Sequence, residues 1–347
     1  MKATEKLIRQ NMFSMEDAYS REDESDDRNF YETIRLVNHL DKTALATVEE
    51  IIGNLIVENK PVILDLMASW NSHIPSGVTP AKVVGIGLNS YELEHNKSLT
   101  EYLIQDLNKN PLLPFDDNSF DVVLNTVSVE YLTQPVYVFN EVARVLKPGG
   151  LFLVIFSNRW FPEKVVKIWE IIDEKDRIEL VKAYFVDAQI FEEPEVLISM
   201  GKPRPKDDKY YQYGIPSDPI FAVYAEKKGG KEKRKKRDEI NKNAPLINNE
   251  DFQLKKSQIK QTLQCPYCGE KMKKWLVPND PFIEWNNEYM YICFNDYCPY
   301  LVRGWKVMFD QGVLGTSYRL MYDPERECVI PAPVHSLTDL KDCIITE

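Results

Sequence analysis

The feature that most constrains the fold of this chain is a series of short apolar runs in the stretch from residue 62 to residue 150. Four such runs alternate with helical or loop-like segments, and they occupy residues 62–66, 82–86, 102–107 and 120–125. Runs of this kind are typical of strands buried on both faces of a parallel sheet, because crossover helices cover both faces. The sequence therefore predicts an open α/β sheet.

Two of these runs carry an aspartate at or near the carboxyl end, namely Asp65 and Asp106. In open α/β sheets, ligands bind in the crevice beyond the carboxyl ends of the strands. Both aspartates are therefore candidate ligand-binding residues.

The remaining elements of this domain follow from periodicity and from turn residues. Apolar residues at helical spacing predict a helix over 43–57, and Pro135 is suited to start another that ends at the Lys-Pro-Gly-Gly of 147–150. A fifth strand at 151–156 precedes two helical patterns, at 163–172 and 176–185. Strand-like runs at 196–199 and 220–225 are joined by a loop with no helix, which indicates an antiparallel pair at the sheet edge.

Composition excludes some classes of protein. A net charge of −11 argues against a protein that coats nucleic acid through bulk electrostatics. No apolar run approaches the roughly 18 residues that span a bilayer, and the amino terminus lacks a signal-peptide core. We therefore expect a cytoplasmic protein without a membrane partner.

Four cysteines near the carboxyl end form two pairs. Cys265 and Cys268 are separated by two residues, and Cys293 and Cys298 by four. Four thiolates so arranged favour one tetrahedral zinc ion in a zinc ribbon, with a redox dithiol and unliganded thiols as alternatives. Alternating runs at 289–292 and 301–305 predict strands on either side of the second pair.

The sequence predicts four segments. Residues 1–29 are acidic and polar and are expected to form a flexible arm, whereas a charge run without apolar residues dominates the first part of the linker. Such a run is either simply solvated or attracts a polyanion. The predicted segments are an arm at 1–29, an α/β domain at 30–226, a basic linker at 227–262, and a zinc ribbon with a carboxyl-terminal extension at 263–347.

Two longer motifs connect the first domain to a known family. Residues 113–121 read Leu-Pro-Phe-Asp-Asp-Asn-Ser-Phe-Asp, and residues 141–150 read Glu-Val-Ala-Arg-Val-Leu-Lys-Pro-Gly-Gly. With Asp65-Leu66 and Gln105-Asp106-Leu107, they resemble class I S-adenosylmethionine-dependent methyltransferases of type 11. The resemblance covers about residues 30–226 and implies a Rossmann-like seven-stranded sheet with an antiparallel edge pair. The cysteine region resembles zinc fingers of the ogr/Delta kind.

This resemblance implies a set of cofactor-binding residues. Asp106 would accept a hydrogen bond from the adenine amino group, with Leu107 beside the ring. Segments 30–31, 35–41 and 157–159 would lie over the pocket. The full set that we expect to bind S-adenosylmethionine is Asp65, Leu66, Met67, Asn89, Asp106, Leu107, Asn125 and Ser128.

The chain also departs from the family in two places. Met67, Ser69 and Asn71 replace glycines of the loop after the first strand, where the backbone must turn with positive φ. Gly87 stands where the family places an acid for the ribose hydroxyls, so that Asn89 or Glu92 would have to supply an oxygen.

Two functions remain open at this stage. The first is a methyltransferase whose acceptor is a small molecule by preference, with His73, Glu130 and Tyr131 as candidate bases. The second is a scaffold without catalysis, whose zinc ribbon and basic linker bind nucleic acid or a protein. For the nucleic-acid case, lysines and arginines beside Trp275 and Trp305 could stack bases.

Overall fold

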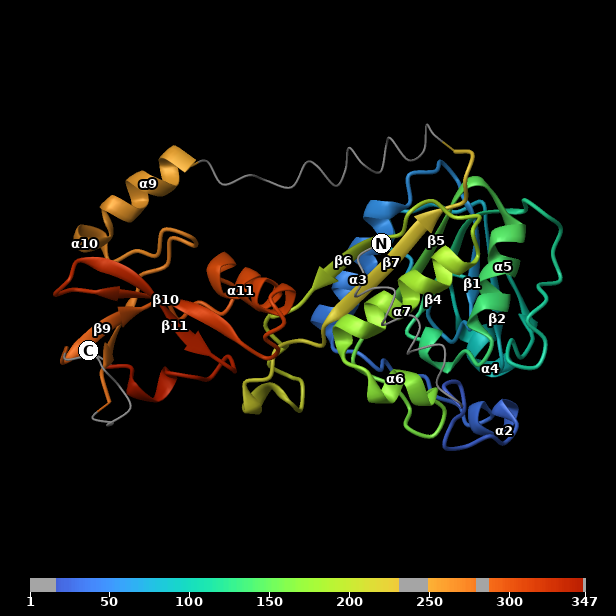
Figure 1. Cartoon of the computed structure of the whole chain (residues 1–347), viewed down its shortest axis with the longest axis horizontal. Coiled ribbons are helices and arrows are strands. Elements are labelled where there is room, and N and C mark those ends of the chain that lie inside the picture. The colour runs from blue at the N-terminus through green and yellow to red at the C-terminus, as the bar shows by residue number, and fades with distance from the viewer. Residues whose placement is uncertain (1–16, 231–248, 279–286, 346–347) are drawn as a thin grey trace. The chain divides into compact units, whose positions relative to one another are not determined.

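The computed structural model describes residues 17–230, 249–278 and 287–345 (Figure 1). These residues fall into two compact units. The described part of the first unit comprises residues 17–40, 45–198 and 220–230, and that of the second comprises 41–44, 199–219, 249–278 and 287–345. Within the described residues, we find no helix with the length and hydropathy that a membrane crossing requires.

The first unit is built on a seven-stranded sheet with the order β3-β2-β1-β4-β5-β7-β6. Strands β1 to β5 pair in parallel, and β7 runs antiparallel to β5. This order confirms the predicted Rossmann-like methyltransferase sheet. The strands are β1 Val62–Leu66, β2 Lys82–Gly87, β3 Glu101–Ile104, β4 Phe120–Thr126, β5 Leu146–Phe156, β6 Glu195–Ser199 and β7 Ile220–Glu226.

Helices cover the sheet as crossover connections require. Helix α5 turns Val138, Phe139 and Val142 inward, and the Phe139 ring meets Phe152 of β5 at 4.8 Å and Phe185 of α7 at 5.0 Å. Helices α5 and α7 therefore lie on the same side of the sheet (Figure 1). The helices of this domain are α2 Asp27–Tyr31, α3 Lys42–Leu55, α4 Ser90–His95, α5 Pro135–Val145, α6 Lys167–Ile171 and α7 Glu174–Asp187, with a 3-10 turn at Val129–Tyr131.

Strand β3 differs from its predicted form. The run at 102–107 was expected to be a buried strand, but the strand ends at Ile104, and Leu103 and Ile104 are 38% and 44% exposed. Because β3 stands at the end of the sheet order, it has a neighbour on one side only. Asp106 and Leu107 consequently lie just beyond the strand, at its carboxyl end.

Residues 17–29, part of the predicted arm, have a defined structure. The fully buried ammonium group of Lys164 pairs with Asp23 at 2.8 Å and with Asp27 at 3.1 Å. Backbone hydrogen bonds from Asp23 to Glu163 and from Lys167 to Ser20 extend the contact. This segment thus packs against the chain that follows β5, whereas residues 1–16 lie outside the described residues.

The second unit contains a four-stranded antiparallel sheet with the order β11-β10-β9-β8. Its strands are β8 Lys273–Leu276, β9 Tyr289–Ile292, β10 Ser317–Asp323 and β11 Cys328–Val334. Its helices are α9 Asn249–Ser257, α10 Ile259–Thr262 and α11 Pro299–Asp310, with 3-10 turns at Tyr211–Tyr213 and Lys341–Cys343. Helices α9 and α10 fall within the predicted linker, whose residues 231–248 lie outside the described part.

The predicted strand at 301–305 is wrong, because this segment belongs to helix α11. Pro299 occupies the first turn, where its missing N–H costs no hydrogen bond. Leu301, Trp305 and Met308 are buried and follow at helical spacing. Residues 301–305 alone are too few to distinguish this period from a strand alternation.

Gly201 allows a close approach within the second unit. Its φ is +73°, and a Cβ atom built on it would lie 1.9 Å from Cδ1 of Trp305. The indole therefore packs directly on the glycine backbone, which ties the segment 199–219 to helix α11.

Substituting Gly201→Ala should lower the free energy of unfolding by about 2 to 4 kcal/mol, because the methyl group would overlap the indole and alanine disfavours positive φ. Urea unfolding of the full chain would measure this. Gly312→Ala is the matched control, since Gly312 also has a positive φ of +83° but nothing within 4 Å of its Cβ position. Equal losses in both variants would show that the contact with Trp305 contributes nothing.

Candidate functional site

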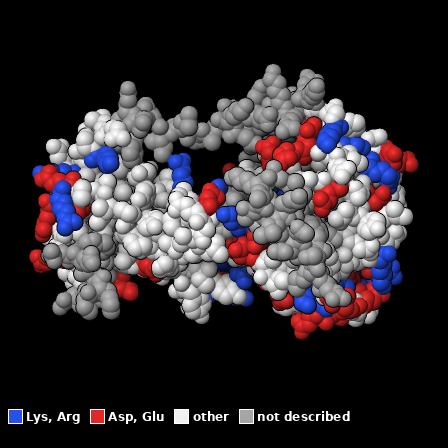
Figure 2. Space-filling view, viewed as in Figure 1, with Lys and Arg blue, Asp and Glu red and all other residues white. Residues whose placement is uncertain are grey.

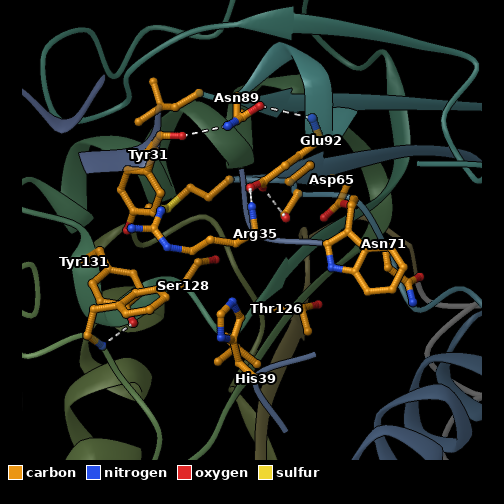
Figure 3. A pocket seen from close by; sticks show the side chains of 18 of the residues that line it. Tyr31, Arg35, His39, Asp65, Asn71, Asn89, Glu92, Thr126, Ser128 and Tyr131 are labelled. Carbon is orange, nitrogen blue, oxygen red and sulfur yellow. Dashed lines mark hydrogen bonds between the residues drawn. The ribbon is translucent and has the colours of Figure 1, made fainter. Parts of the chain in front are cut away.

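The first unit contains a cavity at the carboxyl ends of its central strands (Figure 3). The cavity volume is about 160 Å³, whereas one water molecule needs about 10 to 15 Å³ by the same definition of volume. The cavity can therefore hold a ligand many times larger than water. Met67 and Trp70 line the cavity without filling it.

Most of the residues expected to bind a cofactor come together here. Those that line the cavity are Asp65, Met67, Asn89, Asp106, Leu107 and Ser128. Leu66 and Asn125 do not line it, since both lie buried in the strands beneath. Of the segments expected over the pocket, Tyr31, Arg35 and residues 37–40 line it, whereas residues 157–159 do not.

Asp27 and Phe161 are among the residues of the cavity wall that sequence reasoning missed. Asp27 was assigned to the flexible arm because its neighbours in the sequence are acidic and polar. Its burial follows from the ion pairs with Lys164 and Arg21, which lie 137 positions later and 6 earlier (164 − 27 and 27 − 21). No local sequence pattern reports a pairing over the longer separation.

Besides the ion-paired Asp27, three buried carboxylates line the cavity. Burial raises the pKa of Asp65 to about 7, although a hydrogen bond from Ser72 opposes the shift. Asp106 is 5% exposed and accepts a hydrogen bond from the backbone N–H of Asn108 at 2.9 Å. Glu92 accepts hydrogen bonds from the Ser69 hydroxyl at 2.6 Å and from the backbone N–H of Arg35 at 2.7 Å.

The residues that cap helix α4 hold two parts of the cavity wall. The Asn89 side chain accepts from the backbone N–H of Glu92 as a helix cap and donates to the carbonyl of Tyr31 at 2.8 Å (Figure 3). Asn96 donates to the Ser69 carbonyl at 2.8 Å. The loop after β1 and the segment around Tyr31 are thus both hydrogen-bonded to one short helix.

The loop after β1 keeps the left-handed turn that glycine usually provides. Of the three positions that replace glycines, Met67 has the positive φ, at 55°. Val127, after β4, has a φ of 50° although it is β-branched. A left-handed residue other than glycine costs roughly 1 to 2 kcal/mol, and such strain clusters at functional sites. Both strained residues line the cavity.

Gly87 has no room for a side chain. A Cβ atom at this position would lie 2.3 Å from the carbonyl oxygen of Ala68. The loop after β1 comes this close because Ala68 donates its backbone N–H to Ile86 at 2.7 Å. The missing acid is therefore a consequence of how the loop folds over β2.

Several polar atoms at the cavity are buried without a hydrogen-bond partner within the described residues. These are the hydroxyls of Thr126 and Ser128 and the Nδ1 atom of His73. Buried polar groups are nearly always satisfied in folded proteins. The three atoms consequently mark a place where a polar ligand or water can bind.

The three candidate bases occupy different environments. Burial lowers the pKa of His73 to about 4, and this side chain lines the cavity. Burial raises the pKa of Tyr131, whose hydroxyl accepts from the backbone N–H of Phe161 at 2.9 Å. Glu130 is 1% exposed, does not line the cavity, and has its pKa raised to about 8 by burial. Two of the three candidates therefore reach the cavity.

The second unit brings its four paired cysteines together. The Sγ atoms of Cys265, Cys268, Cys293 and Cys298 all lie within 4.8 Å of one another. The Sγ distance is 3.8 Å from Cys265 to Cys298 and 3.5 Å from Cys268 to Cys293. Four sulfurs around a tetrahedral zinc with bonds of about 2.3 Å are about 3.8 Å apart. The cluster therefore has the dimensions of a tetrahedral metal site.

The tryptophans expected to stack bases are not available for this. Trp275 is 1% exposed and donates its indole N–H to the Leu340 carbonyl at 2.8 Å, and Trp305 is 7% exposed. On the face that Figure 2 shows, the described lysine and arginine side chains are scattered among acidic ones. The prediction that bases stack on these two tryptophans is therefore wrong.

Comparison with known proteins finds that part of the first unit is similar to methyltransferases. Residues 70–154 match the methyltransferase domain family. A fatty-acid O-methyltransferase of Mycolicibacterium smegmatis is 37% identical over 104 residues, which are 28% of this chain and 36% of that protein. A malonyl-[acyl-carrier protein] O-methyltransferase of Marinomonas is 25% identical over 97 residues, 28% of this chain and 34% of that protein.

The chain thus spans about a third of the length of these two relatives. Among solved structures, a SAM-dependent methyltransferase from Aquifex aeolicus aligns with a TM-score of 0.33 at 15% identity, over 54% of this chain and 98% of that one. The family match and the strand order together identify the first unit as a domain of the class I methyltransferase fold.

Proposed function

We propose that the first unit binds S-adenosylmethionine and transfers its methyl group to a small molecule. The observation that carries this proposal is the cavity at the carboxyl ends of the central strands, which combines buried carboxylates with hydroxyls that have no hydrogen-bond partner among the described residues. S-adenosylmethionine is cationic at its ammonium and sulfonium groups and supplies an electrophilic methyl group when bound. A cavity lined by acids suits such a donor.

Asp65 is the residue best placed for the ammonium group of the donor. Its carboxylate is fully buried, and the Ser72 hydroxyl is the side chain that hydrogen-bonds to it. A buried carboxylate with so little compensation is stabilised by an adjacent cation. Ser128 and Thr126 offer hydroxyls that have no hydrogen-bond partner in the described part of the chain, and these could bind polar groups of the same part of the donor.

The nucleoside would be held by Asp106 and Glu92. Asp106, with Leu107, would contact the adenine. For the ribose hydroxyls, Asn89 is unsuitable because its side chain already caps α4 and holds Tyr31. Each oxygen of Glu92 accepts one hydrogen bond and has a lone pair left for another. Glu92 is therefore our candidate for the role that Gly87 cannot fill.

The acceptor is most simply a small molecule. The relatives reported above are named for fatty acids and for a malonyl group on a carrier protein. Tyr31, Val37, Leu40 and Phe161 line the cavity and supply aromatic and apolar side chains beside the donor site.

Titration with S-adenosylhomocysteine tests the donor site. The full chain should bind it, and Asp106→Ala should weaken the binding by about 1 to 3 kcal/mol, because a hydrogen bond to the adenine is lost. Isothermal titration calorimetry would measure both affinities. Asp116→Ala serves as control, since Asp116 is exposed and outside the cavity. Absence of binding to the unmodified chain would contradict the proposed function.

For the second unit we propose that the four-cysteine cluster holds one structural zinc ion. Three of its cysteines are buried within the core cluster that also contains Met272 and Leu301. A site closed in this way, with four protein ligands, has no open position for catalysis.

A further inference from the structure

We propose that Arg35 makes the acceptor side of this cavity a carboxylate-binding site, so that the acceptor is a carboxylic acid that becomes a methyl ester. The inference rests on the proposed function and names its substrate class.

Arg35 presents an uncompensated positive charge to the cavity. Within the described residues, no carboxylate lies within ion-pair distance of its guanidinium group. Glu92 accepts from the backbone N–H of Arg35 and not from its side chain, and Asp27 is engaged by Arg21 at 2.7 Å and by Lys164 at 3.1 Å. The guanidinium has five N–H donors. Among the described residues, only its Nη1 atom is engaged, donating to the carbonyls of Phe30 and Thr33.

Aromatic rings hold the guanidinium in place. It lies 4.6 Å from the ring centroid of Phe30 and 5.4 Å from that of Phe161. The ring of His39 meets Phe161 edge-on at 5.1 Å. An arginine that is stacked in this way retains its planar fork for a carboxylate, because stacking leaves the edge of the guanidinium free. Aromatic surroundings also suit an acid with an apolar body.

The guanidinium group of Arg35 lies apart from Asp65, where we expect the ammonium group of the donor. Figure 3 shows its side chain pointing away from Asp65 and toward the side that carries Tyr31 and Tyr131. Phe161, which stacks with Arg35, follows β5, whereas Asp65 lies in β1, and the two strands are separated by β4 in the sheet. The carboxylate of the donor is bonded to the carbon that carries its ammonium group, so that it would stay near Asp65. The anion at Arg35 is then that of the acceptor.

The chemistry of a carboxylate acceptor agrees with the other groups of the cavity. A carboxylate oxygen forms a bond to the methyl carbon, the carbon–sulfur bond breaks, and its electron pair stays on sulfur. The acceptor loses no proton, the sulfonium becomes a neutral thioether, and the carboxylate becomes an ester. This reaction requires no strong base. The lack of this requirement suits the cavity, because the hydroxyl of Tyr131 already accepts a hydrogen bond from the backbone and Glu130 does not line the cavity. A protonated amine, in contrast, would be repelled by Arg35.

Methyl transfer to three probes of equal chain length tests the proposal. Decanoic acid, decan-1-ol and decylamine would be incubated with the full chain and S-adenosylmethionine carrying a labelled methyl group. We expect the methyl ester of the acid and no product from the alcohol or the amine. Labelled alcohol or amine without labelled ester would overturn the proposal.

Variants of Arg35 identify the role of the guanidinium. Arg35→Gln should raise KM for the acid about 10- to 100-fold, because a charge-assisted hydrogen bond is lost. Arg35→Lys should recover part of this, since it keeps the charge but not the fork. Arg28→Gln is the matched control, because Arg28 is exposed on α2 and does not line the cavity.

Binding of S-adenosylhomocysteine distinguishes the two sources of a carboxylate. If our assignment is right, the Arg35→Gln variant binds S-adenosylhomocysteine with an affinity within about 2-fold of that of the unmodified chain. A loss of that affinity, with 5′-methylthioadenosine binding unchanged, would place the donor carboxylate at Arg35 and overturn the assignment. If the unmodified chain bound neither compound, the proposed function itself would fail. Loss of ester formation in His39→Ala but not in Arg35→Gln would also contradict the role of Arg35.

Discussion

Replacing Cys265 with serine is expected to abolish metal binding and the cooperative folding of the second unit. Structural zinc contributes on the order of 10 to 16 kcal/mol of apparent binding free energy in small zinc domains. Cys265 and Cys298 lie in the same buried core cluster, so that loss of the ion would leave thiols facing one another. Zinc content by mass spectrometry and near-ultraviolet circular dichroism of the full chain would report the change.

Cys328→Ser provides the matched control for this experiment. Cys328 is a half-buried cysteine at the start of β11 and does not belong to the four-sulfur cluster. Its replacement should leave one equivalent of zinc in place. A Cys265→Ser variant that retains one equivalent of zinc and an unchanged circular dichroism spectrum would refute the metal site.

Introducing an acid at Gly87 is expected to damage the donor site rather than restore it. Gly87→Asp would recreate the acid that related methyltransferases carry at this position, but its Cβ would lie 2.3 Å from the backbone oxygen of Ala68. The loop after β1 would have to shift, at a cost of about 1 to 3 kcal/mol or more. Because Met67 and Ser69 belong to this loop, binding of S-adenosylhomocysteine should fall by at least about 10-fold, the equivalent of 1.4 kcal/mol.

The matched control is Gly77→Asp, since Gly77 has nothing within 4 Å of its Cβ position. This variant adds the same charge to the same unit and should preserve both stability and binding. Urea unfolding and calorimetric titration would be run on both variants. Tighter binding by Gly87→Asp would mean that the loop moves readily and that Glu92 has not taken over the ribose contact.

The candidate site could be predicted in part. Asp65 lies near the end of β1 and Asp106 just beyond β3, and strand ends in a parallel sheet converge on one edge, so their meeting was predictable from sequence position. Ser128 was expected from the family resemblance. Glu130 was proposed as a candidate base but does not line the cavity. The direction of its side chain depends on the 3-10 turn at Val129–Tyr131, which has no clear signal in the sequence.

Local sequence patterns also gave a wrong secondary structure where the same residues fit both the periodicity of a strand and that of a helix. The run at 301–305 alternates like a strand, and only its continuation to Met308 on a helix that begins at Pro299 shows the longer period. Trp275 and Trp305 were expected to be able to stack bases because basic residues lie near them in the sequence. Their burial results from contacts with Leu340 and Gly201, both distant along the chain.

The sequence by itself determined the alternation of strands and helices, the seven-stranded sheet and the pairing of four cysteines, because these depend on spacing along the chain. The tertiary structure alone decided which groups share the cavity. Glu92 reaches Arg35 and Ser69 across separations of 57 and 23 residues, and Lys164 reaches Asp23 across 141 (164 − 23). Contacts at such separations form only once the sheet brings distant segments together, and no local period encodes them.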